Sequence, residues 1–322
     1  MIRAMNDDKA TIEILIADQW DDYALLDSGN LLKLERFGPY CFVRPEPQAM
    51  WKPRLDANHW QADGTFIASQ TSRRDGEDGD DGNDGNDSKG GGWKLRNGLP
   101  ADWEIGYQSL RFRARPTPFR HLGFFPEQAC HWDWCAAKIR AATTAGSPDS
   151  RPRILNLFAY SGIASLHAAE AGAEVTHVDA SKKAITHAFE NRDAAGLQDA
   201  PIRFITDDAM RFVERELRRG RCYDGIIMDP PKYGRGPKGE IWRVEQDLVP
   251  LLSACRDLLS DTPLFMLLTI YAIRASSQAA HYAMREVMTG GQVTSGELAV
   301  AEAQANPRVI SQANFARWQP AS

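Results

Sequence analysis

The chain has 322 residues, 43% of them hydrophobic, which is enough for about two domains with substantial cores. It holds no apolar run of the ~18 residues that a membrane-spanning helix needs, and its first residues are polar and unlike a signal peptide. Its five scattered cysteines include no C-x-x-C pair, which argues against a disulfide framework or a zinc site. We therefore expect a cytoplasmic protein with no metal centre and no membrane partner.

The formal net charge of −5 is misleading, because residues 75–92 contain seven acidic residues and one lysine. The rest of the chain holds 37 basic and 36 acidic residues and is close to neutral. Residues 75–92 have almost no apolar side chain, so we expect a flexible acidic Gly/Asp insertion there. Elsewhere the chain carries local basic clusters that permit an anionic partner, one of them formed by Lys232, Arg235, Lys238 and Arg243.

Residues 1–115 are predicted to form a small β-rich domain. Short apolar or alternating runs, such as Ile12–Ile16 and Leu31–Phe37, are separated by turn signals such as Asp27–Asn30. This part also carries aromatic residues that we expect to be exposed and to serve a partner surface, for example in a homo-oligomer: Trp51, Trp60 and Trp93.

Residues 116–150 are predicted to connect this domain to the rest of the chain. A helix is expected from Glu127 to about Ala142, followed by a linker at Ser147–Pro152. Beyond it, residues 151–322 alternate between continuous apolar runs and helical segments. Such runs are typical of parallel strands that are covered on both faces, so we predict a Rossmann-like, doubly wound α/β sheet.

The first predicted strand of this sheet, Arg153–Phe158, runs into a turn of small residues before a helix. Ala159, Ser161 and Gly162 permit a close approach of the backbone to a ligand at the helix N-terminus, although a tight turn alone would explain them equally well.

The next two strands end in carboxylates. Asp179, at the end of the second strand, suits the hydroxyl groups of a ribose, and Ser181 is an equally good cap for the following helix. At the third strand end, one of Asp207 and Asp208 is expected to cap a helix and the other to accept a hydrogen bond from an adenine amino group. We assign the adenine role to Asp208.

The fourth strand ends in Asp229-Pro230-Pro231-Lys232-Tyr233. Proline lacks the N–H group that a strand needs, so the chain must leave the sheet at Asp229. Because ligands bind at the carboxyl edge of such sheets, this segment predicts a catalytic loop. The G-x-G-x-x-G pattern of dinucleotide oxidoreductases and the P-loop pattern are both absent.

Together these motifs make residues 121–318 resemble a class I S-adenosylmethionine-dependent methyltransferase. The most similar branch is the bacterial large-subunit ribosomal RNA methyltransferases, whose motifs resemble Gly123–Gln128, Leu155–Gly162 and Asp229–Lys232. The resemblance implies a seven-stranded sheet whose last strand is antiparallel, S-adenosylmethionine as the cofactor, and RNA as the partner. The cofactor-binding residues that it implies are Asn156, Phe158, Ala159, Tyr160, Ser161, Gly162, Asp179, Ala180, Ser181, Asn191, Asp208, Ala209 and Asp229.

On the acceptor side we assign catalytic roles to Asp229, Pro230, Lys232 and Tyr233. Asp229 and the carbonyl group of Pro230 would accept hydrogen bonds from a target amine, and Tyr233 would stack on a base. Lys232 would hold a phosphate or only stabilise the loop electrostatically. Relatives that methylate C5 of cytosine carry a cysteine near the end of strand five, where this chain has Leu267–Tyr271. We therefore predict an RNA methyltransferase with a nitrogen acceptor; a substrate other than RNA and a non-catalytic cofactor-binding protein stay as alternatives.

Overall fold

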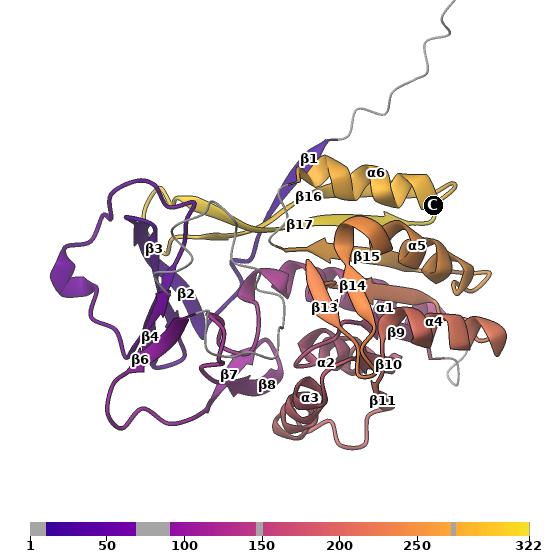
Figure 1. Cartoon of the computed structure of the whole chain (residues 1–322), viewed down its shortest axis with the longest axis horizontal. Helices are drawn as coiled ribbons and strands as arrows, with labels where there is room; N and C mark the ends of the chain where they lie inside the picture. The colour runs from indigo at the N-terminus through magenta and orange to yellow at the C-terminus, as the bar shows by residue number, and fades with distance from the viewer. Residues whose placement is uncertain (1–10, 69–90, 146–150, 272–274, 322) are drawn as a thin grey trace, which may run out of the picture.

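The computed structural model describes residues 11–68, 91–145, 151–271 and 275–321. Its centre is an eight-stranded sheet with a row of helices on each face (Figure 1). In spatial order the strands are β1 (Ile12–Ile16), β16 (Gln292–Ala301), β17 (Val309–Gln319), β15 (Phe265–Ile270), β12 (Gly225–Met228), β9 (Arg153–Leu157), β10 (Glu174–Asp179) and β11 (Ile202–Thr206).

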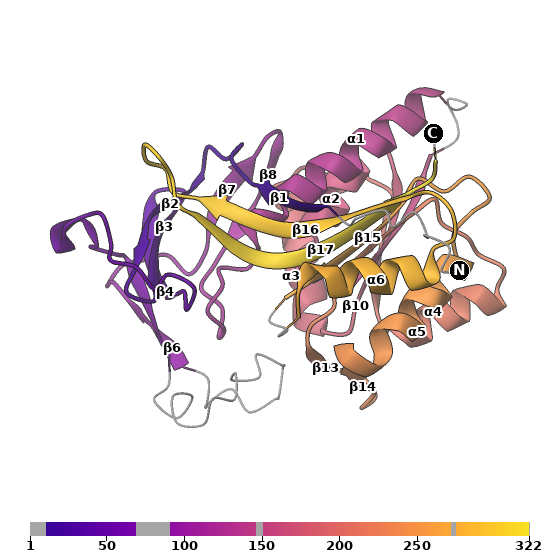
Figure 2. The same cartoon turned by 90° about the horizontal axis from the view of Figure 1, so that it is seen from above.

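Strands β12 and β15 are buried along their whole length, because successive side chains enter two different cores. Ile226 and Met228 contact the core beneath one row of helices, whereas Ile227 contacts the core beneath the other row. The first row is α4 (Ala209–Arg218), α5 (Val244–Asp257) and α6 (Ser277–Val287), and the second is α1 (Ala129–Ala145), α2 (Ile163–Glu170) and α3 (Lys182–Ala194). Figure 2 shows α1 above the strands and α4, α5 and α6 below them.

The predicted doubly wound sheet is confirmed, with two corrections. Strand β17 is antiparallel to both of its neighbours, as expected for the closing hairpin. However, Ile12–Ile16 pairs in parallel with β16 instead of joining the small β-rich part, so the sheet has eight strands and not seven. Helix α6 was not predicted from the sequence. The domain boundaries at residues 115 and 150 stay a prediction, although β1, which belongs to the predicted N-terminal domain, pairs with β16 of the large sheet.

The N-terminal part contains a five-stranded sheet and a separate hairpin. Their aromatic side chains, including Phe37, Phe42 and Phe112, form a core that continues to Leu166 of α2. This shared core joins the small sheet to the large one. The strands are β2 (Tyr23–Gly29), β3 (Leu32–Phe37), β4 (Tyr40–Pro45), β5 (Gly64–Ala68) and β6 (Gly91–Leu95), with the hairpin β7 (Trp103–Tyr107) and β8 (Leu110–Ala114).

Three tryptophans that we expected to be exposed are half-buried, which corrects the predicted partner surface. The indole N–H groups of Trp51, Trp60 and Trp93 donate hydrogen bonds to Ser28, Asp27 and Thr117, respectively, within the chain. Apart from Gly91 and Gly92, which begin β6, the predicted acidic insertion lies outside the described residues. No helix in the described ranges is long and apolar enough to cross a membrane.

Candidate active site

The turn between β9 and α2 holds an unusual backbone conformation at the carboxyl edge of the sheet. Phe158, Tyr160 and Gly162 have φ angles of 53°, 46° and 86°, in a region that residues other than glycine rarely adopt. Each such non-glycine residue costs about 1–3 kcal/mol and persists only where the surroundings enforce it. Here the N–H of Ala159 donates to the carbonyl of Val178 at 3.1 Å, which ties the turn to β10.

Asp179, at the end of β10, fixes the same turn through both carboxylate oxygens. Oδ2 accepts a hydrogen bond from the N–H of Tyr160 and Oδ1 one from the N–H of Ser181, each at 2.8 Å. Ser181 caps α3 by accepting from the N–H of Ala184 at 3.3 Å, so Asp179 is not needed as a cap. A carboxylate offers about four acceptor sites, which leaves Asp179 further capacity for a ligand.

Asn156 and Asn191 support the turn, and for Asn191 the structure corrects the prediction. The side-chain amide of Asn156 donates to Oγ of Ser165 at 2.9 Å. Asn191 is fully buried: its amide donates to the carbonyl of Ser161 at 2.8 Å and accepts from the N–H of Arg113. Because both halves of this amide are used inside the protein, Asn191 positions the turn and is not placed to contact a cofactor.

The roles predicted for the two aspartates after β11 are only partly supported. Asp208 caps α4, because its Oδ1 accepts from the N–H of Arg211 at 3.0 Å. Asp207 forms an ion pair with Arg215 and accepts from the N–H of Asp208. The capping role therefore belongs to Asp208, and only its second oxygen is left for an adenine. Burial raises the pKa of Asp208, and the nearby Glu240 and Asp207 add to this effect.

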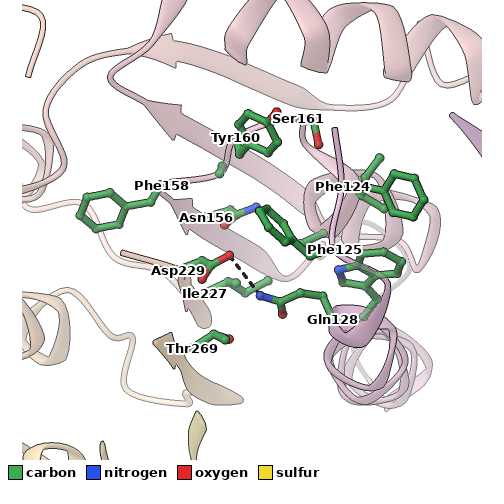
Figure 3. A pocket seen from close by; sticks show the side chains of 14 residues that line it. Phe124, Phe125, Gln128, Asn156, Phe158, Tyr160, Ser161, Ile227, Asp229 and Thr269 are labelled. Atoms are coloured by element: carbon green, nitrogen blue, oxygen red, sulfur yellow. Dashed lines mark hydrogen bonds between the residues drawn. The ribbon is translucent and has the colours of Figure 1, made fainter. Parts of the chain in front are cut away.

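A cavity of about 60 Å³ opens between the β9–α2 turn, the end of β12 and the short 3-10 helix η3 (Pro126–Gln128). Figure 3 shows Asn156, Tyr160 and Ser161 on one side and Asp229, Gln128 and Thr269 on the other. The ring of Phe158 points away from Gln128 in this view and packs against Trp242, with 5.0 Å between ring centroids. The lining residues are Phe124, Phe125, Gln128, Trp132, Asn156, Phe158, Ala159, Tyr160, Ser161, Ile163, Ala164, Ile227, Asp229 and Thr269.

Asp229 is the charged residue of this cavity. It follows the last residue of β12, and its Oδ2 accepts a hydrogen bond from the side-chain amide of Gln128 at 3.1 Å (Figure 3). Its Oδ1 is buried and has no hydrogen-bond partner among the described residues. Burial, reinforced by the charge of Glu127, raises the pKa of Asp229 well above its ordinary value. A buried oxygen without a partner is costly in a folded protein, which marks it as available to a ligand.

Several predicted site residues do not line the cavity, among them Gly162, Asp179, Asn191 and Asp208. Lys232 and Tyr233 lead into a hairpin, β13 (Tyr233–Arg235) and β14 (Ile241–Arg243), and the guanidinium of Arg243 lies 5.9 Å from the ring centroid of Tyr233. That contact occupies a face of the ring expected to stack on a base. Pro230, Ala180, Ser181 and Ala209 lie outside the lining as well.

Sequence reasoning missed the residues that face Asp229 from η3 and from the end of β15. Gln128 and Phe125 belong to a segment whose resemblance was noticed, but no role was assigned to them. Tyr271 follows β15, and its hydroxyl accepts a hydrogen bond from Gln128 at 3.0 Å. In the sequence, the end of strand five was considered only as a possible site for a catalytic cysteine. A tyrosine at this strand end could have been recognised there as a further candidate site residue.

Comparison with known proteins supports this architecture over nearly the whole chain. The crystal structure of a SAM-dependent methyltransferase from Agrobacterium tumefaciens is 45% identical and superimposes with a TM-score of 0.85, covering 96% of this chain and 94% of that one. A protein from Streptococcus mutans, provisionally assigned to the same class, superimposes at 0.66 over 94% of this chain and 76% of its own; at 14% identity it supports the fold alone. No protein-family profile matches the chain.

The fold and the site thus define a class I methyltransferase. The chain belongs to the SAM-dependent methyltransferases, and its cofactor is S-adenosylmethionine. Curated relatives match a shorter segment. The ribosomal RNA large subunit methyltransferase K/L of Shewanella baltica is 40% identical over 119 residues, and methyltransferase I of Aeromonas salmonicida is 32% identical over 108 residues. These matches cover 36% and 33% of this chain but only 16% and 24% of those proteins.

The residues of the site fit this cofactor. Asp179 keeps free acceptor capacity at the end of β10, where a ribose would be held. Gly162 begins α2 in a left-handed conformation, and a Cβ atom there would come within 3.0 Å of the Cβ of Ala188. The turn is thus closely packed from behind, and it contributes Ala159, Tyr160 and Ser161 to the cavity lining.

Proposed function

We propose that this protein transfers a methyl group from S-adenosylmethionine to a nitrogen atom of an RNA base, with ribosomal RNA as the substrate class. The observation that carries the proposal is the unpaired, buried Oδ1 of Asp229, located in a cavity whose opposite wall is the strained β9–α2 turn. The names of the curated relatives support ribosomal RNA, although the matched segments span less than a quarter of those proteins.

The donor side is formed by the first three strand ends. We assign the ribose hydroxyls to Asp179, the adenine amino group to the second oxygen of Asp208, and the methionine part to the turn from Phe158 to Gly162. When bound, S-adenosylmethionine supplies a methyl group on a sulfonium sulfur, which needs no further activation. The protein's own contribution is therefore alignment, which its rigid turn is suited to provide.

On the acceptor side, Asp229 orients the nitrogen and takes up its proton. With Asp229 ionised, Oδ1 accepts a hydrogen bond from the N–H of the target, which aims the nitrogen lone pair across the cavity. As the nitrogen gained its new bond to carbon, the carbon–sulfur bond would break with its electron pair left on the sulfur, and the N–H proton would pass to this carboxylate. Burial raises the pKa of Asp229, so its carboxylate takes up a proton more readily than an exposed one, which suits this role.

The cysteines argue against attack on C5 of cytosine, which requires a thiolate nucleophile. All five lie in the described part of the chain, and none lines the cavity. Burial raises the pKa of Cys130 to about 11 and that of Cys135 to about 12, so both thiols are protonated at neutral pH.

The half-buried ring of Phe125 replaces Tyr233 as the surface on which we expect a base to stack. Phe125 lines the cavity beside Asp229, and its ring centroid lies 5.1 Å from that of Tyr271. Stacking on an aromatic ring is the usual way in which proteins hold an unpaired RNA base. The basic β13–β14 hairpin follows Asp229 directly in the chain and supplies charge for the RNA backbone.

The proposal is tested by incubating the protein with S-adenosylmethionine labelled in its methyl group and with ribosomal RNA, total RNA or protein extract, followed by nucleoside analysis. We expect label in an N-methylated base of ribosomal RNA, lost with Asp229→Ala. Label in protein or in 5-methylcytosine would overturn the substrate or the acceptor atom. Cofactor binding without transfer to any fraction would indicate a cofactor sensor.

A further inference from the structure

Four polar side chains from three separate segments meet at the acceptor side of the cavity. Glu127 and Gln128 lie on η3, Tyr271 follows β15, and Asp229 follows β12. The side-chain amide of Gln128 donates both to Oδ2 of Asp229 at 3.1 Å and to the hydroxyl of Tyr271 at 3.0 Å. Burial raises the pKa of Tyr271 well above its ordinary value, and the charges of Glu127 and Asp229 add to this effect.

The donors and acceptors of this chain permit only one direction. An amide nitrogen can only donate, so the hydroxyl of Tyr271 accepts from Gln128. Gln128 therefore holds Asp229 by one N–H and is itself held by Tyr271 through the other. This arrangement leaves Oδ1 of Asp229 as the oxygen without a partner in the described structure.

The network also reaches the small β sheet. Glu127 is 5% exposed, and burial raises its pKa; the positive charges of Lys33 on β3 and Arg44 on β4 partly offset this rise. These cations are held in place by Glu46, 3.3 Å from Lys33, and by Glu35, 2.7 Å from Arg44. Buried charges of the N-terminal part thus act on Glu127, which acts on Asp229.

We propose that Gln128 and Tyr271, with the adjacent Glu127, are positioning residues for methyl transfer, which hold and tune the acceptor-side carboxylate of Asp229. The inference rests on the proposed role of Asp229.

Opposite effects on Asp229 follow from two substitutions in the same short helix. Glu127→Gln removes the negative charge that disfavours ionisation, so the pKa of Asp229 should fall. Gln128→Leu removes the hydrogen bond that favours the carboxylate, so the pKa should rise. Tyr271 and Gln128 are neutral at the relevant pH, and Lys33 and Arg44 act through Glu127, so Glu127 is the charged group that faces Asp229.

The direct test needs no substrate: titration of the Asp229 carboxyl carbon by NMR in protein labelled at aspartate Cγ, with Asp229→Asn to assign the signal. Glu127→Gln should move the midpoint to lower pH and Gln128→Leu to higher pH. Two matched controls at exposed positions, Glu245→Gln and Gln198→Leu, should leave it unchanged. Unchanged midpoints, or shifts in the same direction, would overturn the inference. If Gln128→Leu does not fold, Glu127→Gln alone decides: a lower midpoint supports the network and an unmoved one overturns it.

The kinetic arm uses Tyr271→Phe, which removes one hydroxyl group and keeps the ring. Loss of this hydrogen bond should lower kcat by about tenfold and leave the KM for S-adenosylmethionine unchanged. An unchanged kcat would remove Tyr271 from the network. The failures are distinguishable: transfer that survives Asp229→Ala refutes the proposed function, whereas loss of transfer in Asp229→Ala with unmoved midpoints refutes only the network.

Discussion

The two sides of the cavity contain different energetically unfavourable features: a strained backbone on the donor side and a buried oxygen without a hydrogen bond on the acceptor side. The donor-side turn has a strained backbone, with positive φ at Phe158 and Tyr160, but both oxygens of Asp179 are hydrogen-bonded. The acceptor side has no positive φ between Asp229 and Tyr233, yet it buries a carboxylate oxygen without a partner. The strained β9–α2 turn forms the surface that we expect to bind the cofactor, whereas the carboxylate of Asp229 lacks a partner at the place where we expect a proton to be transferred.

Asp229→Ala is expected to have the largest effect, and this effect should be confined to methyl transfer on the acceptor side. Loss of the group that orients the nitrogen and accepts its proton should lower transfer by about 10²–10⁴-fold. Affinity for S-adenosylmethionine, measured by calorimetry, should stay nearly intact because the donor-side turn is untouched. A large loss of affinity would show that the two sides are not separable.

Asp179→Ala should have the reverse signature. It removes the acceptor of the Tyr160 and Ser181 N–H groups together with the proposed ribose contact. We expect affinity for S-adenosylmethionine to fall by about 10- to 100-fold, the value of one or two hydrogen bonds to a charged group. Unchanged affinity in calorimetry would refute the ribose role.

Asparagine at the same two positions should change stability in opposite directions. Asp229→Asn removes a carboxylate whose ionisation inside the fold is unfavourable, and it should raise the free energy of unfolding by about 1–3 kcal/mol once the pH exceeds the pKa of Asp229. The folded-state pKa of Asp229 is raised, so the folded state binds the extra proton and wild-type stability falls as pH rises from about 4 towards that pKa. The advantage of Asp229→Asn should therefore grow with pH in thermal unfolding.

Asp179→Asn is the matched comparison, because it replaces an oxygen that accepts from a backbone N–H with an amide that cannot. It should lower the melting temperature. If both asparagine variants moved the melting temperature in the same direction, the contrast between a satisfied and an unsatisfied carboxylate would be wrong.

The smallest effect is expected from Tyr233→Ala. Its ring is covered by Arg243 and does not line the cavity, so transfer should change by no more than about twofold. Phe125→Ala is the informative partner, since a clear rise in the KM for RNA is expected there. A reversed pattern would restore Tyr233 as the stacking residue.

Much of the sheet could be predicted from sequence, because its strands are continuous apolar runs that end in polar residues. Arg153–Phe158, for instance, was placed to within one residue of β9. The misplaced strand, Ile12–Ile16, alternates in exposure along a sheet edge, and nothing in such a local pattern identifies a partner almost 300 residues away. Long-range pairing of this kind is set by the whole fold.

The site shows the same limit. Asp179 and Asp229 could be found because each follows a strand, and their position is a consequence of topology. Other features depend on hydrogen bonds that only the folded structure shows. They are the capping role of Asp208, the structural role of Asn191 and the contact between Gln128 and Tyr271. No periodicity or spacing encodes those contacts, so they emerged only from the structure.

The central claim is that Asp229 serves a nitrogen acceptor on RNA. It is tested most directly by incubating wild-type protein and Asp229→Ala with methyl-labelled S-adenosylmethionine and ribosomal RNA, and by identifying the labelled nucleoside. The account predicts an N-methylated base with the wild-type protein and no label with the variant. Labelled 5-methylcytosine, or transfer that persists in Asp229→Ala, would contradict it.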